Sequence, residues 1–322
     1  MQTSQNPTIS IVAPCFNEAA TLPEFYRRVS EAMQALGDTW ELILVDDGSQ
    51  DETATILRDL ALNDPHIRPV IFARNFGHQL AVTAGLDYSR GQAVVIIDSD
   101  LQDPPEVIPA LIAEWHNGYE VVYAIRTERE GETWFKLLTA SLFYRLIYRI
   151  TDVNIPLDTG DFRLLDRKVV NVINQMRERH RFLRGMSVWV GFRQTGVPYK
   201  RAARYAGETK YPLKKMVKFA GDAITGFSYF PLQLATYLGF AAAGISILAI
   251  PVVVALRIAG SQAFFGQATT LIAVLFLGGV QLIFLGILGE YIGRIYDEAR
   301  GRPLYIVRED PGSFDQQETF PS

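Results

Sequence analysis

The most concentrated set of potential ligand atoms is the stretch 98–103 (DSDLQD), which directly follows the apolar run Val94–Ile97. Oxygen ligands at this spacing suit a hard divalent cation such as Mg²⁺ or Mn²⁺, which proteins hold through one or two carboxylates together with substrate phosphates. A cation there would offset the charge of a diphosphate leaving group. An Asp-x-Asp pair also arises by chance in surface loops, so the position after a buried strand is what favours metal binding.

Two further polar clusters follow apolar runs, at 14–18 (PCFNE) and 45–49 (VDDGS). Carboxylates at strand ends accept hydrogen bonds from ribose hydroxyls or from a base N–H. The alternative is that Asp46 or Asp47 only caps the following turn. We favour ligand binding for Glu18 and Asp47, and Asp46 stays open between the two interpretations.

Short apolar runs that alternate with helical periodicity predict an α/β fold, with a mostly parallel sheet and helices on both faces. Ligands of such sheets bind beyond the carboxyl ends of the strands, so the three polar clusters are expected to meet at one rim. The predicted strands span 9–13, 41–45, 70–73, 93–97 and 120–124, and the predicted helices span 24–36, 53–62, 78–88 and 105–117. Loops are expected at 131–132 and around Pro198.

Two long stretches without a charged residue lie in the carboxy-terminal part, at 223–256 and 258–289. A membrane-spanning helix needs roughly 20 apolar residues, and we predict helices near 232–256 and 268–289. Basic residues flank the outer ends, which the positive-inside rule places in the cytoplasm. A soluble helical hairpin is the alternative, and two uncharged stretches of this length argue against it.

Two other segments have an amphipathic pattern. In 133–150, aromatic and aliphatic residues alternate with basic ones, which suits either a helix in the membrane interface or a helix packed on the sheet. The segment 210–230 begins with several lysines, and we favour contact with anionic head groups over a solvated face. The expected organisation is a cytoplasmic domain (1–209), a juxtamembrane helix (210–230), a two-helix hairpin (231–290) and a cytoplasmic tail (291–322) with a short strand near 303–308.

Composition excludes some classes of protein. A formal net charge of −4 over 322 residues argues against a nucleic-acid-binding protein that works through a basic surface. The single cysteine, Cys15, has no disulfide partner within the chain and lies in an apolar run, so we expect it in the core. The first seven residues lack the basic-then-apolar pattern of a signal peptide, so we expect the amino-terminal part in the cytoplasm.

Taken in order, the motifs at 14–18, 45–49 and 98–103 resemble those of family 2 glycosyltransferases, which have the GT-A nucleotide-sugar fold. The closer resemblance is to polyprenyl-phosphate glycosyltransferases, a group that includes dolichyl-phosphate mannose synthase. Within this group the chain looks most like bacterial bactoprenol (undecaprenyl-phosphate) glucosyltransferases, which share two carboxy-terminal membrane helices and the stretch 157–164 (LDTGDFRL). The Gln-x-x-Arg-Trp motif of processive polysaccharide synthases is absent from the sequence, which favours a single transfer.

The resemblance, which covers roughly residues 8–308, implies roles for particular residues. The nucleotide-sugar would be held by Pro14, Phe16, Glu18, Val45 and Asp47, with Ser99 beside its diphosphate and Arg126 near that diphosphate or the acceptor phosphate. The metal, Mg²⁺ or Mn²⁺, would be held or oriented by Asp98, Asp100 and Gln102. Asp161 matches the catalytic carboxylate, Arg204 and Lys210 match phosphate ligands in a mobile acceptor loop, and His78 is expected to border the nucleotide.

The chemistry of the acceptor leaves the role of Asp161 open. A lipid phosphate is largely a dianion near neutral pH, because its second pKa is about 6. Such a nucleophile needs cations such as Arg204 and Lys210 more than it needs a general base. Asp161 can take a remaining proton, position a sugar hydroxyl or a basic side chain, or form a structural salt bridge with Arg163 or a neighbour.

The leading hypothesis is an inverting transfer of glucose from UDP-glucose to undecaprenyl phosphate at the cytoplasmic face of the inner (plasma) membrane. GDP-mannose, a UDP-amino sugar or an aminoarabinose donor stays open, because resemblance alone favours glucose. A non-catalytic nucleotide-binding membrane adaptor is a second hypothesis. A transporter is a third, which the lack of ionisable residues in the middle of either predicted helix disfavours. Glycines in both helices permit close packing, so a homo-oligomer is expected.

Overall fold

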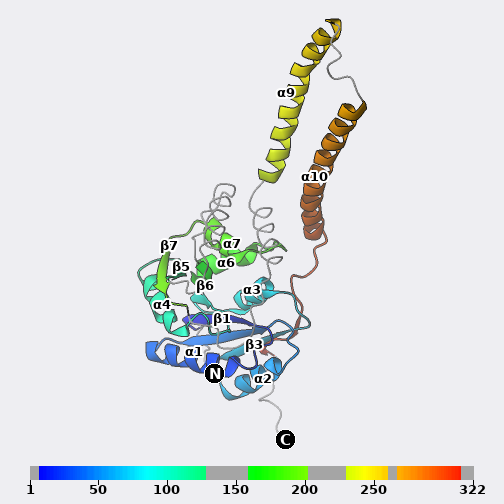
Figure 1. The fold of residues 1–322 in the computed structure, drawn as a ribbon. Coiled ribbons are helices and arrows are strands. Elements are labelled where there is room, and N and C mark those ends of the chain that lie inside the picture. The colour runs from blue at the N-terminus through cyan, green and yellow to red at the C-terminus, as the bar shows by residue number, and fades with distance from the viewer. Residues whose placement is uncertain (1–6, 128–158, 202–229, 260–266, 313–322) are drawn as a thin grey trace. The chain divides into compact units, whose positions relative to one another are not determined.

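A computed structural model describes residues 7–127, 159–201, 230–259 and 267–312 (Figure 1). The chain divides into two compact units. The first contains 1–148, 153–212 and 302–322, and the second contains 149–152 and 213–301. The segments expected as interfacial and juxtamembrane helices, 133–150 and 210–230, lie outside the described residues apart from Phe230, as do Arg204 and Lys210.

The first unit is built on an eight-stranded mixed sheet with the order β7-β5-β6-β4-β1-β2-β3-β8. Its strands are β1 (Ile9–Cys15), β2 (Trp40–Asp46), β3 (Ile67–Phe72), β4 (Ala93–Ile96), β5 (Val121–Arg126), β6 (Thr159–Asp166), β7 (Gln194–Tyr199) and β8 (Val307–Glu309). The neighbours β4, β1, β2 and β3 are parallel, and so are β5 and β7. Strand β6 is antiparallel to both β4 and β5, and β8 is antiparallel to β3.

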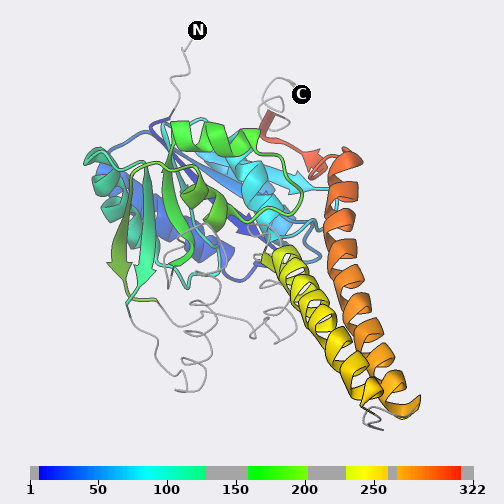
Figure 2. The ribbon, with the colours of Figure 1, turned by 90° about the horizontal axis from the view of Figure 1, so that it is seen from above.

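Helices cover both faces of this sheet (Figure 2). They are α1 (Leu22–Leu36), α2 (Thr53–Asn63), α3 (His78–Tyr88), the 3₁₀ helix η1 (Pro105–Val107), α4 (Ile108–His116), α6 (Arg167–Gln175) and α7 (Leu183–Trp189). The α/β class, the mostly parallel sheet and the four predicted helices are therefore confirmed.

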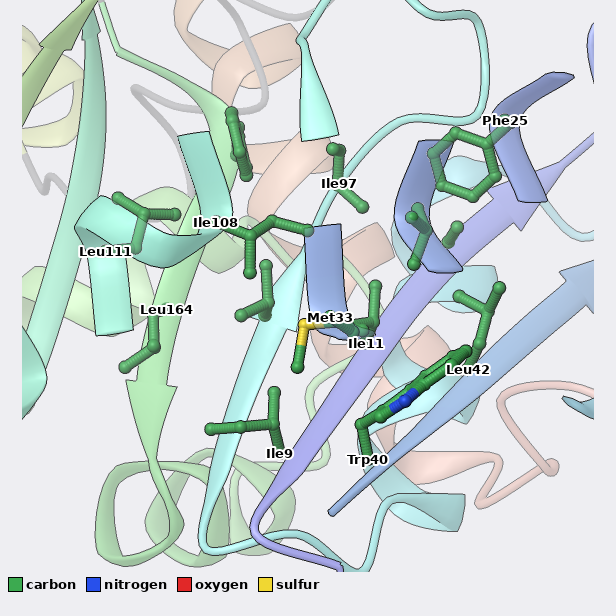
Figure 3. Close-up of a cluster of buried hydrophobic side chains, with 14 of the residues drawn as sticks. Ile9, Ile11, Phe25, Met33, Trp40, Leu42, Ile97, Ile108, Leu111 and Leu164 are labelled. Carbon is green, nitrogen blue, oxygen red and sulfur yellow. The ribbon is translucent and has the colours of Figure 1, made fainter. Parts of the chain in front are cut away.

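The core explains why the central strands are continuous apolar runs. Strands β1 and β2 are buried along their whole length, as expected for strands covered on both faces. On one face, Ile9, Ile11 and Leu42 pack with Phe25 and Met33 of α1 (Figure 3). On the other face α3 approaches closely, since a Cβ at Gly85 would lie 2.1 Å from Val12 Cγ1. The single cysteine, Cys15, is buried at the end of β1, which confirms its assignment to the core.

The expected loop around Pro198 is wrong, because this residue lies in β7. Within the described residues, strand β7 is at the edge of the sheet and pairs with β5 alone. An edge strand tolerates proline, since one of its sides has no ladder hydrogen bond to lose. Helix α6 follows β6 directly, and the Asp166 side chain caps it by accepting from the Lys168 N–H at 2.9 Å.

The segment after residue 301 belongs to the first unit. It contributes β8, at 307–309, where a strand near 303–308 was predicted. Glu309 pairs with Arg58 of α2 at 2.7 Å, and Tyr305 stacks on Phe72 and donates to Asp87 at 2.6 Å. These side-chain contacts, together with the β3–β8 pairing, fix the segment to the edge of the sheet.

The second unit contains two long helices, α9 (Phe230–Ile258) and α10 (Gln267–Ala299). Within them, Ala235–Leu256 has a mean hydropathy of 2.3 and Phe276–Ala299 one of 1.6, and neither stretch is buried by the rest of the chain. Both are long and apolar enough to cross a membrane. The first matches its predicted range closely, and α10 continues beyond the predicted end at 289 to Ala299.

A buried acid at the opposite end of the sheet from the polar clusters organises several charges. Glu41, on β2, is almost fully buried and accepts from Ser10 Oγ at 2.6 Å and from the Arg90 N–H at 2.7 Å. Its other oxygen accepts from Arg68 at 2.9 Å and from Arg90 at 3.0 Å. Burial alone would raise the pKa of Glu41, but these hydrogen bonds and the two arginines lower it below its usual value.

We expect Glu41→Gln to lower the free energy of unfolding by about 1–3 kcal/mol near neutral pH, because it removes a negative charge that accepts several hydrogen bonds. The folded-state pKa lies below the unfolded value of about 4.3, so this stabilisation is present above that pH and is lost as pH falls through the folded pKa. Thermal unfolding of wild type and variant over a pH series measures the difference. Glu31→Gln, on the exposed face of α1, is the control, and a wild-type advantage that persists undiminished in acid would contradict the prediction.

Candidate active site

The register between β4 and β6 brings two distant acidic residues together. Ile96, the last residue of β4, pairs with Arg163 across the antiparallel strands. Asp98 follows two residues beyond Ile96 and Asp161 precedes Arg163 by two, so the continued register brings the two carboxylates to the same place. Asp161 stands near the start of β6, which lies at the carboxyl ends of the parallel strands. The predicted rim therefore contains a carboxylate from an antiparallel strand as well.

His78 lies between these two carboxylates. Its Nε2 is 3.2 Å from Asp161 Oδ2 and 3.6 Å from Asp98 Oδ1. Partial burial lowers the pKa of His78, but the charges of Asp98 and Asp161 outweigh this effect and raise it to about 9. The histidine is therefore a cation near neutral pH, at the position where α3 begins.

Asp161 is surrounded by hydrogen-bond donors. Arg184 of α7 donates from Nε to Oδ1 at 2.7 Å and from Nη2 to Oδ2 at 3.3 Å, and Gln79 lies 3.5 Å from Oδ2. Burial alone would raise the pKa of Asp161, but the charge of Arg184 and the hydrogen bonds from His78 and Arg184 hold it well below its usual range. The salt bridge anticipated with Arg163 or a neighbour is formed with Arg184, while Arg163 donates to the Asp161 backbone carbonyl at 3.3 Å.

Asp98 differs from Asp161 in its hydrogen bonding and in the direction of its pKa shift. Its Oδ1 is buried and accepts no hydrogen bond. Burial raises the pKa of Asp98, and although the charge of His78 lowers it, the charges of Asp161, Asp103 and Asp100 add to the increase. The imidazole of His78, 3.6 Å away, is the cationic group that faces this oxygen, so a metal ion would have to share or replace that contact.

The loop after β4 has a constrained backbone. Leu101 is buried and has a φ of 60°, which is rare outside glycine. Asp100 Oδ1 accepts from the Gln102 N–H at 3.1 Å, and Gln102 Oε1 accepts from Arg201 at 2.8 Å. This conformation turns the loop so that Asp98 and Asp100 stay at the rim.

Asp103, at the end of this loop, is fully buried and anchors two arginines. Tyr199 of β7 donates to its Oδ1, Arg201 lies 3.4 Å from the same oxygen, and Arg126 lies 3.6 Å from Oδ2. Arg126 also donates to the Tyr199 hydroxyl at 3.1 Å. The end of β5 and the residues after β7 are thereby tied to the Asp98–Asp103 loop.

The first polar cluster forms the turn after β1. Ser99 is buried and donates to the Pro14 carbonyl at 2.8 Å, which links this turn to β4. Phe16 is exposed at this turn. Glu18 is half-buried and accepts from the Thr21 hydroxyl at 2.8 Å.

The second polar cluster supports the backbone around it. Asp47 is buried and accepts from the N–H groups of Phe76 at 2.6 Å and Gly77 at 2.9 Å, which fixes the loop before α3. Asp46 accepts from the Ser49 N–H at 3.1 Å, so for Asp46 the turn-capping interpretation describes the structure. The Val45 side chain is fully buried in the core, which leaves only its backbone for a ligand.

The residues at the rim fit a hard cation that substrate oxygens help to hold. Within the ranges that the structure describes, no three His, Cys, Asp or Glu side chains form a group able to hold a metal. Mg²⁺ typically takes one or two carboxylates and completes its shell with phosphates and water. Asp98 Oδ1, which accepts no hydrogen bond, and the adjacent Asp100 match this pattern. His78 lies 3.6 Å from that oxygen, and Gln102 would first have to release Arg201.

Several residues of the site were not singled out from the sequence, notably Arg184, Gln79 and Tyr199. Arg184 lies 23 positions beyond Asp161 in the chain, on a short helix without a distinguishing motif. Tyr199 ends a strand that was expected to be a loop. No local pattern identifies these residues, whereas the acidic strand ends were recognisable from the sequence.

Comparison with known proteins now defines the class. Residues 10–173 match the model of glycosyl transferase family 2, and the chain belongs to this family. The GT-A nucleotide-sugar fold and the resemblance to bactoprenol glucosyltransferases are thereby confirmed.

Similarity to individual relatives extends over almost the whole chain. An uncharacterized glycosyltransferase of Bacillus subtilis, YkcC, is 50% identical over 96% of both chains. The bactoprenol glucosyl transferase of Shigella phage SfV is 43% identical over 94% of this chain and 98% of its own. Among solved structures, glucosyl-3-phosphoglycerate synthase from Mycobacterium tuberculosis, in complex with Mn²⁺, UDP-glucose and phosphoglyceric acid, aligns with a TM-score of 0.46 and 22% identity, covering 68% of this chain and 78% of that one.

We expect Gly160→Ala to weaken nucleotide-sugar binding with little effect on folding. A Cβ at Gly160 would lie 2.5 Å from Arg126 Nη2, so the guanidinium has to move while the backbone, which is not in the left-handed region, does not. Calorimetric titration with UDP-glucose and thermal unfolding test both parts. Arg126→Gln removes the guanidinium charge that Gly160→Ala only displaces, and it should also weaken binding. Unchanged affinity in both variants would show that Arg126 does not contact the donor.

Proposed function

We propose that this protein transfers one sugar from a nucleotide-sugar to a polyprenyl phosphate, with inversion, and that the favoured pair is UDP-glucose and undecaprenyl phosphate. The observation that carries the proposal is the extent of similarity to the bactoprenol glucosyl transferases. Sequence identity to the Escherichia coli prophage homolog is 42% over 93% of this chain, and identity to the phage SfV protein is 43% over 94%. The similarity therefore extends beyond the family-matched residues 10–173. The preference for glucose rests on these relatives' names.

The chemistry of the rim supports a reaction between two anions. A phosphate oxygen of the acceptor forms a bond to the anomeric carbon as the bond to the diphosphate oxygen breaks, and the nucleoside diphosphate leaves. No proton has to move when the acceptor arrives as a dianion. The main requirement is to hold like charges together, for which Arg126, Arg204 and Lys210 are the proposed cationic ligands.

The donor side of the proposal uses the strand ends. Pro14, Phe16, Glu18, Val45 and Asp47 surround the nucleoside, and Ser99 lies beside the diphosphate. Asp98, Asp100 and Gln102 hold or orient Mg²⁺ or Mn²⁺, which would supply charge neutralisation for the departing diphosphate. The buried Oδ1 of Asp98, which accepts no hydrogen bond, supports this assignment. Asp161 is the proposed catalytic carboxylate.

The two apolar helices, α9 and α10, support a membrane location for the reaction. We propose that they form a hairpin across the inner (plasma) membrane, with 1–209 and the tail 291–322 on the cytoplasmic side. A polyprenyl acceptor is itself confined to the bilayer, so an anchored enzyme meets it in two dimensions. A homo-oligomer is part of the proposal, because Gly239 and Gly244 of α9 have open space beside them that admits a neighbouring helix.

We expect Asp98→Asn and Asp100→Ala to reduce sugar transfer to near background without unfolding the protein, because each removes a carboxylate of the proposed cation site. Transfer by the wild type should likewise stop in excess chelator and return with added Mg²⁺ or Mn²⁺. Asp59→Asn, an exposed carboxylate on α2, is the matched control. Full activity of the Asp98 or Asp100 variant, or of the wild type in chelator, would contradict the metal assignment.

The choice of donor is tested with a panel. Purified protein, polyprenyl phosphate and a divalent cation are incubated with each of several UDP- and GDP-sugars, and the lipid product is identified by mass spectrometry. We expect a single hexose to be added, most efficiently from UDP-glucose. Binding of a nucleotide-sugar without turnover, in the wild type as in Asp161→Asn, would instead support the adaptor hypothesis. A product from another sugar would keep the chemistry and correct the donor.

A further inference from the structure

The Asp161 carboxylate is clamped from two elements at once. Arg184, in the first turn of α7, donates to both of its oxygens, at 2.7 and 3.3 Å. His78 and Gln79, in the first turn of α3, approach the same Oδ2 at 3.2 and 3.5 Å. Only 12% of the Asp161 side chain is exposed, so the protein itself occupies most of the space from which a substrate could contact this carboxylate.

Arg184 is itself held in place by its neighbours. Its Nη1 donates to the Thr159 carbonyl at 3.3 Å, in the same strand as Asp161. Gln79 accepts from the Leu183 N–H at 3.0 Å and so connects the starts of α3 and α7. The guanidinium is thereby fixed relative to β6 as well as to α3.

A second arginine braces the backbone behind this clamp. Arg163 is almost fully buried and donates to the carbonyls of Asp161, at 3.3 Å, and Gly160, at 2.8 Å. It also donates to the Ser187 hydroxyl, which in turn donates to the Arg184 carbonyl at 3.0 Å. The helix that carries Arg184 is therefore attached to the strand that carries Asp161.

We propose that Arg184 is a positioning residue of the transfer reaction, which holds Asp161 as a fixed, ionised carboxylate beside His78 and the proposed cation site. The proposal deepens the proposed function and rests on it. An ionised carboxylate that accepts charge-assisted hydrogen bonds on both oxygens is strongly oriented and is a poor proton acceptor. Asp161 then contributes a negative charge of defined direction, which orients His78 near Asp98, and the acceptor phosphate keeps the role of nucleophile without a general base.

Steady-state kinetics of Arg184→Gln and Arg184→Lys test this role, with UDP-glucose, undecaprenyl phosphate and Mg²⁺ over a pH series. We expect Arg184→Gln to lower the plateau kcat about 100-fold, as for a misplacement of about 1 Å, while the donor KM changes less than about threefold. Lysine keeps the charge but lacks the planar fork, so it should recover part of the loss. Because the two residues act as one unit, Arg184→Gln combined with Asp161→Asn should be no slower than the slower single variant.

A destabilised but kinetically normal variant provides the control. Arg181 is also buried, and it donates to the carbonyls of Ile173 and Met176 at the end of α6. Arg181→Gln should lower the unfolding temperature and leave kcat per folded molecule unchanged. An Arg184→Gln enzyme whose plateau kcat stays within twofold of the wild-type value overturns the proposal, whether or not the acid limb of its kcat–pH profile moves to higher pH.

The failure of the proposed function has a different signature. A wild-type protein that transfers no sugar to polyprenyl phosphate from any donor contradicts that function alone. Hydrolysis of UDP-glucose, in which water replaces the lipid phosphate as acceptor and glucose and UDP are released, then provides the comparison of the same variants. A loss in Arg184→Gln and Asp161→Asn that does not add in the double variant supports the positioning role, and additive losses overturn it.

Discussion

The site depends on one electrostatic constraint: four carboxylates, those of Asp98, Asp100, Asp103 and Asp161, share one rim of the sheet. At an effective dielectric constant of about 20, two like charges about 4 Å apart repel by about 4 kcal/mol. Folding tolerates this only because cationic side chains from other elements lie among them. Asp161, Asp103 and Asp98 have such partners in Arg184, Arg126 and His78, respectively. The placement of α3, α7 and β5 around the rim thus supplies the compensating charges, in addition to covering apolar surface.

This constraint explains how far the sequence could predict the site. The parallel strands and their acidic ends were recognisable because a buried strand is a continuous apolar run and its carboxyl end lies at the ligand-binding rim. Asp98 and Asp100 were therefore placed correctly at the end of β4. The helices covering these strands were predicted to within a few residues, since their periodicity is local.

The compensating partners could not be predicted because they depend on pairings between distant parts of the chain. Nothing local distinguishes Arg184 from the other arginines of 177–193, and its relation to Asp161 exists only once α7 lies against β6. The antiparallel direction of β6, which sets Asp161 opposite Asp98, is also a property of the assembled sheet. A loop was predicted around Pro198 for a similar reason. A proline is tolerated in a strand at the edge of a sheet, and the edge position of β7 is known only once the sheet is assembled.

Two carboxylates of one rim therefore occupy opposite states, and the difference indicates a division of roles. Asp161 accepts hydrogen bonds on both oxygens, and its pKa is held well below its usual range. Asp98 keeps one buried oxygen without a donor, and its pKa is raised. A carboxylate oxygen without a hydrogen bond is stabilised most by a cation that arrives with the substrate. A carboxylate whose two oxygens both accept hydrogen bonds has little capacity to accept a proton. When the nucleophile of a transfer arrives already ionised, a carboxylate such as Asp98 is needed to bind a cation, whereas a carboxylate such as Asp161 is needed only to stay in place.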